Sequence, residues 1–261
     1  MPSIGTEAEF LCLDKSGRII NLINQGVLID TDEIGVDGHT DTAELRIPPS
    51  RSMVTQFDNL RTTIAKYVYV LDQWKKAKST YKQVYNPMRG GAYHGTPLGL
   101  HIHFGDFPMK ALPWAVRTLE LVAYHGFLLP CISAEEARTR SGVGAYGRGG
   151  HQSIRIKGAG WWEWRQPYSC LHPNFMVVLL TIAEIVAQCA TRKPHILQAI
   201  FNLKEKHPKV AINPAEFIDA MCDSLRLGTA ERSAGLLAHK LLELGPYDWS
   251  TNLLKEWVEY E

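Results

Sequence analysis

Four short segments of the sequence each carry two ionisable residues that are two positions apart. The four pairs are Glu7 and Glu9, Glu44 and Arg46, His101 and His103, and Glu163 and Arg165. Each pair lies in a segment that reads as a strand, and the side chains of residues i and i+2 point to the same face of a strand. The spacing therefore predicts a β-sheet in which four strands present charge on one face.

Each pair has a simpler interpretation when it is taken alone. Glu7 and Glu9 can be a solvated strand edge, and one of the two histidines can be buried against a backbone carbonyl. The two Glu–Arg pairs can be surface ion pairs, which contribute ~0–1 kcal/mol each. Four such pairs in one chain favour a shared charged face. Like charges on one face repel each other, and a cation such as Mg²⁺, which takes oxygen ligands, would relieve Glu7 and Glu9.

Arginines add positive charge close to these segments. An acid that binds a metal, beside a guanidinium that binds phosphate, suits phosphoryl chemistry. The segment 138–150 is rich in glycine and arginine, which predicts a surface loop that can approach a ligand closely. Polyphosphate is one ligand for these arginines. A nucleic-acid contact with Tyr146 or Trp161 stacking on bases is the alternative. The arginines are Arg138, Arg140, Arg148 and Arg155.

The order of the elements predicts the fold class. Strands are expected first and helices later, which indicates an α+β fold. The expected strands cover 4–13, 18–23, 34–47, 98–105 and 153–166. The expected helices cover 50–78, 112–129 and the chain from 173 onward, with breaks near Pro194, Pro208, Pro214 and Gly228. We expect a single catalytic domain over 1–261, with a sheet-based active-site region in 1–170 and a mainly helical part in 171–261 packed on it.

Composition argues against several classes of protein. The formal net charge of +1 gives no strong field for nucleic acid or an anionic membrane. The apolar stretch 175–190 contains Thr181, Glu184 and Gln188 and is expected to be a buried helix, so no membrane contact is predicted. Five scattered cysteines without a CxxC pair, and no visible export signal, favour reduced thiols in a cytoplasm.

The motifs, taken in order, resemble those of the glutamine-synthetase-like ligases, particularly the phage-associated carboxylate–amine (COOH–NH2) ligases. The resembling segments cover roughly the first two-thirds of the chain, and their order is more specific than any one of them. They are Gly5-Thr-Glu7-Ala-Glu9-Phe10, Asp37-Gly38 with Glu44-Leu-Arg46, Gly99-Leu-His101-Ile-His103-Phe-Gly105, Ile154-Arg155-Ile156, Glu163-Trp-Arg165-Gln-Pro167, and Asn174.

This resemblance implies a curved antiparallel sheet and an ATP-dependent ligase that forms an amide or isopeptide bond through an acyl phosphate. It implies small-molecule or peptide carboxylate and amine substrates, and, for a phage protein, the host cytoplasm; a homo-oligomer is compatible with it. The implied ligands of Mg²⁺ or Mn²⁺ are Glu7, Glu9, Glu44, His101 and Glu163. The implied ATP-binding residues are Arg140, Arg148, Arg155 and Arg165, and the implied catalytic residues are Glu44, Arg46 and Arg165, with Asp37 or Glu44 taking the proton of the amine.

Two other functions stay open on the sequence. One is an ATP:guanidino phosphotransferase, an enzyme related in fold that would stop at the phosphorylated product. The other is a non-catalytic nucleic-acid or virion-associated binding protein that uses the arginine-rich segment; near-neutral net charge speaks against nucleic acid. The chain is much shorter than glutamine synthetase, and its helical part carries no motif that names an acid or an amine.

Overall fold

The fold is built on a seven-stranded antiparallel sheet whose longest strand, β1, spans Ser3–Asp14. The computed structural model describes residues 1–24, 26–27, 31, 33–36, 41–77, 84–93, 96–142, 153–206 and 211–260. Six strands follow the order β2-β3-β1-β7-β9-β8, and β4 pairs with the far end of β1. These strands are β2 Ile34–Val36, β3 Ala43–Ser50, β4 Val84–Arg89, β7 Leu100–Gly105, β8 Ile154–Gly158 and β9 Trp161–Trp164. A separate small hairpin joins β5 Ala92–Tyr93 to β6 Thr96–Pro97.

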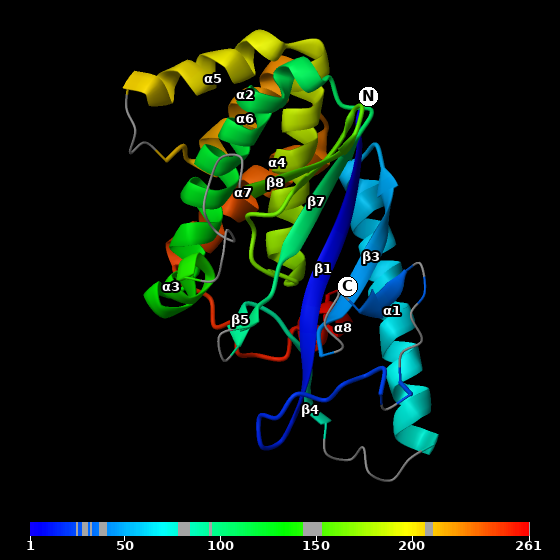
Figure 1. The fold of residues 1–261 in the computed structure, drawn as a ribbon. Helices are drawn as coiled ribbons and strands as arrows, with labels where there is room; N and C mark the ends of the chain where they lie inside the picture. Colours follow the sequence, from blue (N-terminus) through cyan, green and yellow to red (C-terminus); the bar gives the residue numbers. More distant parts are fainter. Residues whose placement is uncertain are drawn as a thin grey trace.

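Helices cover the apolar face of this sheet. In β1 the apolar residues alternate with Glu7 and Glu9, and Phe10 packs edge to face on Tyr67 of α1 (Met53–Ala77), with ring centres 5.0 Å apart. Phe104 of β7 stacks on Trp162 of β9 at 4.3 Å. Each such buried aromatic side chain stabilises the fold by roughly 1.5–3 kcal/mol. Figure 1 shows α1 and α4 behind the long central strands, so the other face of those strands is the one that carries the charged pairs.

Helix α4, Pro173–Arg192, is the central helix of the C-terminal part and contacts both α1 and β1. This helix begins after His172, whose side chain accepts a hydrogen bond from the backbone N–H of Asn174. By length and composition α4 could cross a membrane, but 83% of its most apolar window is buried inside the protein, as in a core helix. The remaining helices are α2 Leu112–Thr118, α3 Ala134–Gly142, α5 Pro194–Lys206, α6 Pro214–Leu225, α7 Thr229–Leu244 and α8 Leu253–Val258.

The α+β class and the antiparallel sheet predicted from the sequence are confirmed. The expected helix over 112–129 is continuous, although its middle, Leu119–Leu128, is π-helical and its end, Leu129–Cys131, is a 3-10 turn. All five cysteines are buried as free thiols. The division of the chain at residue 170 stays a prediction.

Two expectations about local structure were wrong. Residues 18–23 do not form a strand, because only Ile19 bridges to Leu13 before the chain turns away. The arginine-rich segment is not a loop at its start: residues 134–142, including Arg138 and Arg140, form α3. The helix begins with a reciprocal pair of hydrogen bonds between Ser133 and Glu136, the capping-box arrangement that favours a helix start.

Candidate active site

The strand register brings the paired residues of different strands directly opposite one another. Glu7 lies opposite Arg46 on one side and His101 on the other. Glu163 lies opposite His103 and, across the next pair of strands, opposite Arg155. Side chains of cross-strand partners point to the same face of a sheet. The predicted metal and phosphate residues of β1, β3, β7, β8 and β9 therefore share one face.

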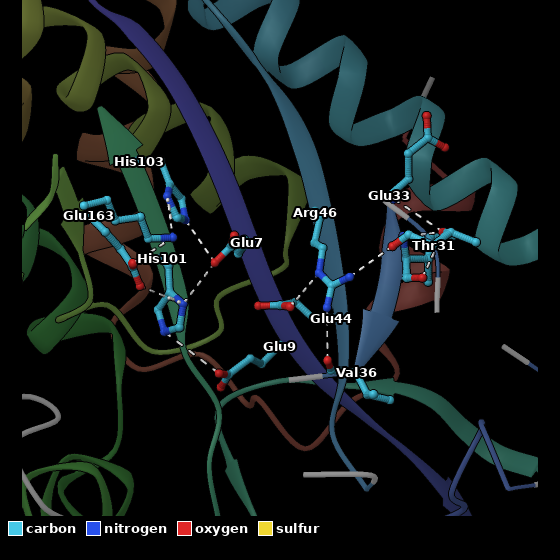
Figure 2. Close-up of polar contacts among 12 residues, drawn as sticks. Glu7, Glu9, Thr31, Glu33, Val36, Glu44, Arg46, His101, His103 and Glu163 are labelled. Carbon is cyan, nitrogen blue, oxygen red and sulfur yellow. Dashed lines mark hydrogen bonds and ion pairs between the residues drawn. The ribbon is translucent and has the colours of Figure 1, made fainter. Parts of the chain in front are cut away.

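His101 lies at the centre of the acidic part of this face (Figure 2). Its Nδ1 is 3.3 Å from Oε1 of Glu163 and 3.6 Å from Oε2 of Glu7, and its Nε2 is 3.9 Å from Oε1 of Glu9. His103 approaches the same Glu7 oxygen, with Nε2 at 3.0 Å. Three carboxylates and two imidazoles thus converge over three neighbouring strands.

Glu44 and Arg46 form the second part of the face, on β3. Arg46 Nε lies 3.0 Å from Oε2 of Glu44, and its two terminal nitrogens donate to the carbonyl oxygens of Thr31 and Val36 at 3.0 Å each (Figure 2). Glu44 is buried and Arg46 is half-buried. The guanidinium therefore positions Glu44 and links β3 to the backbone on both sides of β2 by hydrogen bonds.

Two groups of three residues have ligand atoms close enough to share a metal ion. One is Glu7, Glu44 and His101, and the other is Glu7, His103 and Glu163, with the atoms of each group within 4.8 Å of one another. Carboxylate oxygens with imidazole nitrogens form a donor set that suits Mg²⁺ or Mn²⁺.

Unsatisfied buried atoms support a cation between these residues. Within the described part of the chain, His101 Nε2 and Glu163 Oε2 are buried and make no hydrogen bond. The space beside His101 Nε2 is open because residue 99 is glycine. A Cβ there would lie 2.9 Å from His101 Nε2 and 3.3 Å from Glu9 Oε2. Buried polar atoms without a partner are rare in proteins, and a bound ion is one way in which such atoms are satisfied. The residues present fit a divalent cation.

The surroundings of Glu7 and His101 shift the pKa values of both side chains toward the forms that can bind a cation. Burial would raise the pKa of the Glu7 carboxyl, but hydrogen bonds from His101 and His103 outweigh it and hold the pKa well below its usual range. Burial lowers the pKa of His101, against the opposing effect of the neighbouring carboxylates. Glu7 is therefore ionised and His101 neutral at pH 7, and a neutral imidazole offers the lone pair that metal binding requires.

Positive charge gathers on the β8–β9 side of the face. Arg165 Nε lies 3.0 Å from Oε1 of Glu163, and Arg155 is exposed on β8, opposite Glu163. The backbone of Arg140 lies in α3, but its side chain lies outside the described residues, as do Arg148 and Asp37 altogether. Of the four expected phosphate ligands, Arg155 and Arg165 are thus the two that the structure places beside the acidic residues.

Two further residues belong to the site. His103, which the HxH spacing had placed beside His101 without a ligand role, contacts Glu7. Lys157, for which the sequence predicted no role, contacts Glu163 with Nζ at 3.1 Å from Oε2. Its signal was the two-residue spacing from Arg155, which in a regular strand puts both cations on one face.

A hollow of about 370 Å³ opens beside the acidic residues. Glu7, Arg46 and His103 line it on the charged side, and Pro49 and Trp161 line it on the apolar side. It has room for a small molecule or the end of a peptide next to the candidate cation sites.

No family model and no curated protein matches the sequence. Among solved structures, the fold is similar to that of a bifunctional glutathione synthetase from Pasteurella multocida, with 13% identity and a TM-score of 0.50 over 98% of this chain and 47% of that protein. It is also similar to PafA, the ligase of the prokaryotic ubiquitin-like protein Pup, with 9% identity and a TM-score of 0.57 over 93% of this chain and 63% of PafA. The chain thus spans less than two-thirds of either protein, and the similarity shows that it shares their α+β fold.

Proposed function

We propose that the protein is an ATP-dependent carboxylate–amine ligase that forms an amide or isopeptide bond through an acyl phosphate. The observation that carries this proposal is the convergence of four carboxylates and two imidazoles with Arg155 and Arg165 on one sheet face. Such acids and imidazoles bind divalent cations, and arginines bind phosphate. The fold shared with a synthetase and a ligase supports the same function.

Two cation positions follow from the geometry of the residues. Glu44 and His101 would hold one cation and His103 and Glu163 a second, with Glu7 between them. The carboxylate of Glu9 faces His101 and would complete the first position. When bound, Mg²⁺ would neutralise the phosphate oxygens of ATP and make its γ-phosphorus more electrophilic.

The first chemical step transfers the γ-phosphoryl group of ATP to the substrate carboxylate. A carboxylate oxygen forms a bond to phosphorus, the bond from phosphorus to the bridging oxygen breaks, and ADP leaves. Arg155 and Arg165 lie on the side of the face where they would neutralise the charge that develops on the transferred group.

The second step forms the amide bond. The amine nitrogen attacks the carbonyl carbon of the acyl phosphate, the bond from that carbon to the phosphate oxygen breaks, and inorganic phosphate leaves. The nitrogen loses a proton to a carboxylate, for which Glu44 is the candidate that the structure describes. Arg46 lies next to Glu44 and lines the hollow, where it would hold the substrate carboxylate.

The size and lining of the hollow favour an amino acid or a peptide end as one substrate. A volume of about 370 Å³ is too small for a folded protein but admits a side chain or a chain terminus. PafA acts on Pup, which is itself a polypeptide, and this supports a peptide as the acid or amine.

A screen of acid–amine pairs for ADP release, with mass spectrometry of the product, tests the proposal. We expect ADP and inorganic phosphate to appear only when both an acid and an amine are present, with Mg²⁺ or Mn²⁺. A phosphorylated guanidino compound without phosphate release would show a phosphotransferase instead. Salt-sensitive binding of nucleic acid that survives Glu163→Gln, with no ADP release from any pair, would show a binding protein.

A further inference from the structure

The ammonium group of Lys157 lies against one of the two candidate cation positions. Its Nζ is 3.1 Å from Oε2 of Glu163 and 3.4 Å from Nδ1 of His103. Glu163 and His103 are two of the three residues, with Glu7, whose ligand atoms are close enough to share a metal ion. A positive charge supplied by the chain itself thus touches the atoms that a divalent cation would need.

The ammonium of Lys157 is close to Glu163 Oε2 but is not oriented for a hydrogen bond to it. Glu163 is 1% exposed, and within the described part of the chain its Oε2 makes no directional hydrogen bond, although Lys157 Nζ is near. The contact is therefore mainly one of opposite charges. A metal ion has no N–H direction to satisfy and would use the same lone pair more fully.

The histidine presents a second lone pair to the same ammonium. Lysine can only donate, so Nδ1 of His103 accepts from Lys157, and the ring proton lies on Nε2. That nitrogen faces Oε2 of Glu7 at 3.0 Å. Nδ1 of His103 therefore presents a lone pair to the position that the ammonium occupies, and this lone pair can bind a metal ion when the ammonium moves away.

The side chain of Lys157 can move away from Glu163 into solvent. It lies on β8, the edge strand of the main sheet, with 36% of its side chain exposed, and its four-carbon stem is flexible. Arg155 is two residues away and is the cross-strand partner of Glu163, which Lys157 contacts. An ammonium that leaves Glu163 therefore moves into solvent beside an arginine, where the combined charge suits a phosphate group.

We propose that Lys157 competes with the second divalent cation for the position formed by Glu7, His103 and Glu163. In the cation-free protein its ammonium lies against Oε2 of the buried Glu163, while Arg165 contacts Oε1, and a divalent cation must displace the ammonium. The inference rests on the proposed function, because the displaced ammonium of Lys157 would interact with the phosphates of the nucleotide. Lys157 is a positioning residue: it sets the order of cation loading.

The other cation position differs in the charge that lies beside it. There Arg46 contacts Glu44, and backbone carbonyl oxygens hold both terminal nitrogens of the guanidinium in place. Arg46 thus belongs to the frame of that position, whereas the half-exposed Lys157 has to leave before a cation can enter its own. The position at Glu44 therefore fills first.

Titration with Mn²⁺, followed by calorimetry or electron paramagnetic resonance without nucleotide, tests this competition. We expect the wild-type protein to bind two Mn²⁺ ions with unequal affinity. Lys157→Met, which keeps the length of the side chain and removes the charge, should tighten the weaker site on the order of tenfold. Lys15→Met, which removes one exposed charge at the other end of β1, should leave both affinities unchanged.

A second readout separates competition from a structural role. In EDTA, Lys157→Met should melt below the wild type, because Glu163 keeps Arg165 but loses the counter-charge at its Oε2. The variant should also gain more in melting temperature than the wild type when Mn²⁺ is added. Unchanged or weakened Mn²⁺ binding in Lys157→Met, or an equal gain in melting temperature, would overturn the proposal. If the screen of acid–amine pairs still succeeds, only the role of Lys157 fails. If no variant binds Mn²⁺, both proposals fail.

Discussion

Glu9 of β1 and Glu44 of β3 are direct cross-strand partners, and both are buried although both carry a carboxylate. Like charges at opposite positions of two strands destabilise a sheet. Arg46 contacts Glu44 and the backbone N–H of Gly99 donates to Glu9, so each carboxylate has some compensation. A divalent cation held between the two side chains would remove the remaining repulsion, and the predictions below test for it.

Glu9→Gln should abolish Mg²⁺·ATP turnover without unfolding the protein. The amide keeps the shape of the side chain and relieves the repulsion with Glu44, so the melting temperature in EDTA should equal or exceed that of the wild type. The stabilisation by the cation at the first position, about 2.7 kcal/mol at a concentration one hundred times Kd, should be lost. Thermal unfolding with and without Mg²⁺ measures both effects, and a collapse of the melting curve in EDTA would instead assign Glu9 a packing role.

Gly99→Ala should weaken cation binding about tenfold or more while the fold is kept. The added Cβ would lie 2.9 Å from His101 Nε2, in the space where we place the cation. Gly5→Ala is the matched control, because its Cβ would meet Pro49 and His103 only at 3.5 Å or more. Calorimetric titration with Mn²⁺ compares the two variants. Equal affinities would show that the space beside His101 is not used.

Arg165→Lys should lower kcat/KM for ATP about ten- to hundredfold. Lysine cannot present the planar fork that contacts a carboxylate and a phosphate together, and one such charge-assisted contact contributes about 1.5–3 kcal/mol. Arg51→Lys is the control, because Arg51 makes an exposed ion pair with Asp106. Steady-state kinetics with the acid–amine pair found in the screen would contradict the assignment if both variants behaved alike.

His172 should make stability depend on pH in the acid range. Burial lowers its pKa to about 4, although Glu256 lies 3.5 Å away, so the folded protein binds fewer protons than the unfolded chain between pH 6.5 and 4. The stabilisation is therefore complete above pH 6.5 and is lost as the pH falls toward 4, by about 2–3 kcal/mol in total. His172→Asn keeps a good N-cap for α4 without this titration. Urea unfolding of both proteins across that range should show a larger loss in the wild type than in the variant.

The sequence predicted which residues share a face within each strand, but not how the strands pair. The two-residue spacing of Glu7 and Glu9, or of His101 and His103, depends only on the period of a strand. The pairing of Glu9 with Glu44 depends on register, which is set by contacts between distant segments and by a bulge between Ile4 and Thr6.

The sequence did not predict strand β4 and helix α3, because both contain or adjoin residues that are typical of turns and loops. Strand β4 contains Asn86 and Pro87, residue types that are rare inside strands, although it pairs with the far end of β1. Helix α3 was not predicted because glycines follow it closely in the sequence, although Ser133 and Glu136 have the spacing of a capping box. The roles assigned to the individual acids and arginines stay predictions.

Transfer of ¹⁸O from the substrate to phosphate tests the central claim most directly. The acid that supports ADP release would be prepared with both carboxylate oxygens labelled and incubated with ATP, Mg²⁺ and the amine. A ligase that works through an acyl phosphate leaves one labelled oxygen in inorganic phosphate, and we expect one ¹⁸O in each phosphate released. Phosphate that carries only unlabelled oxygen, while ADP and product accumulate, would contradict the proposed reaction.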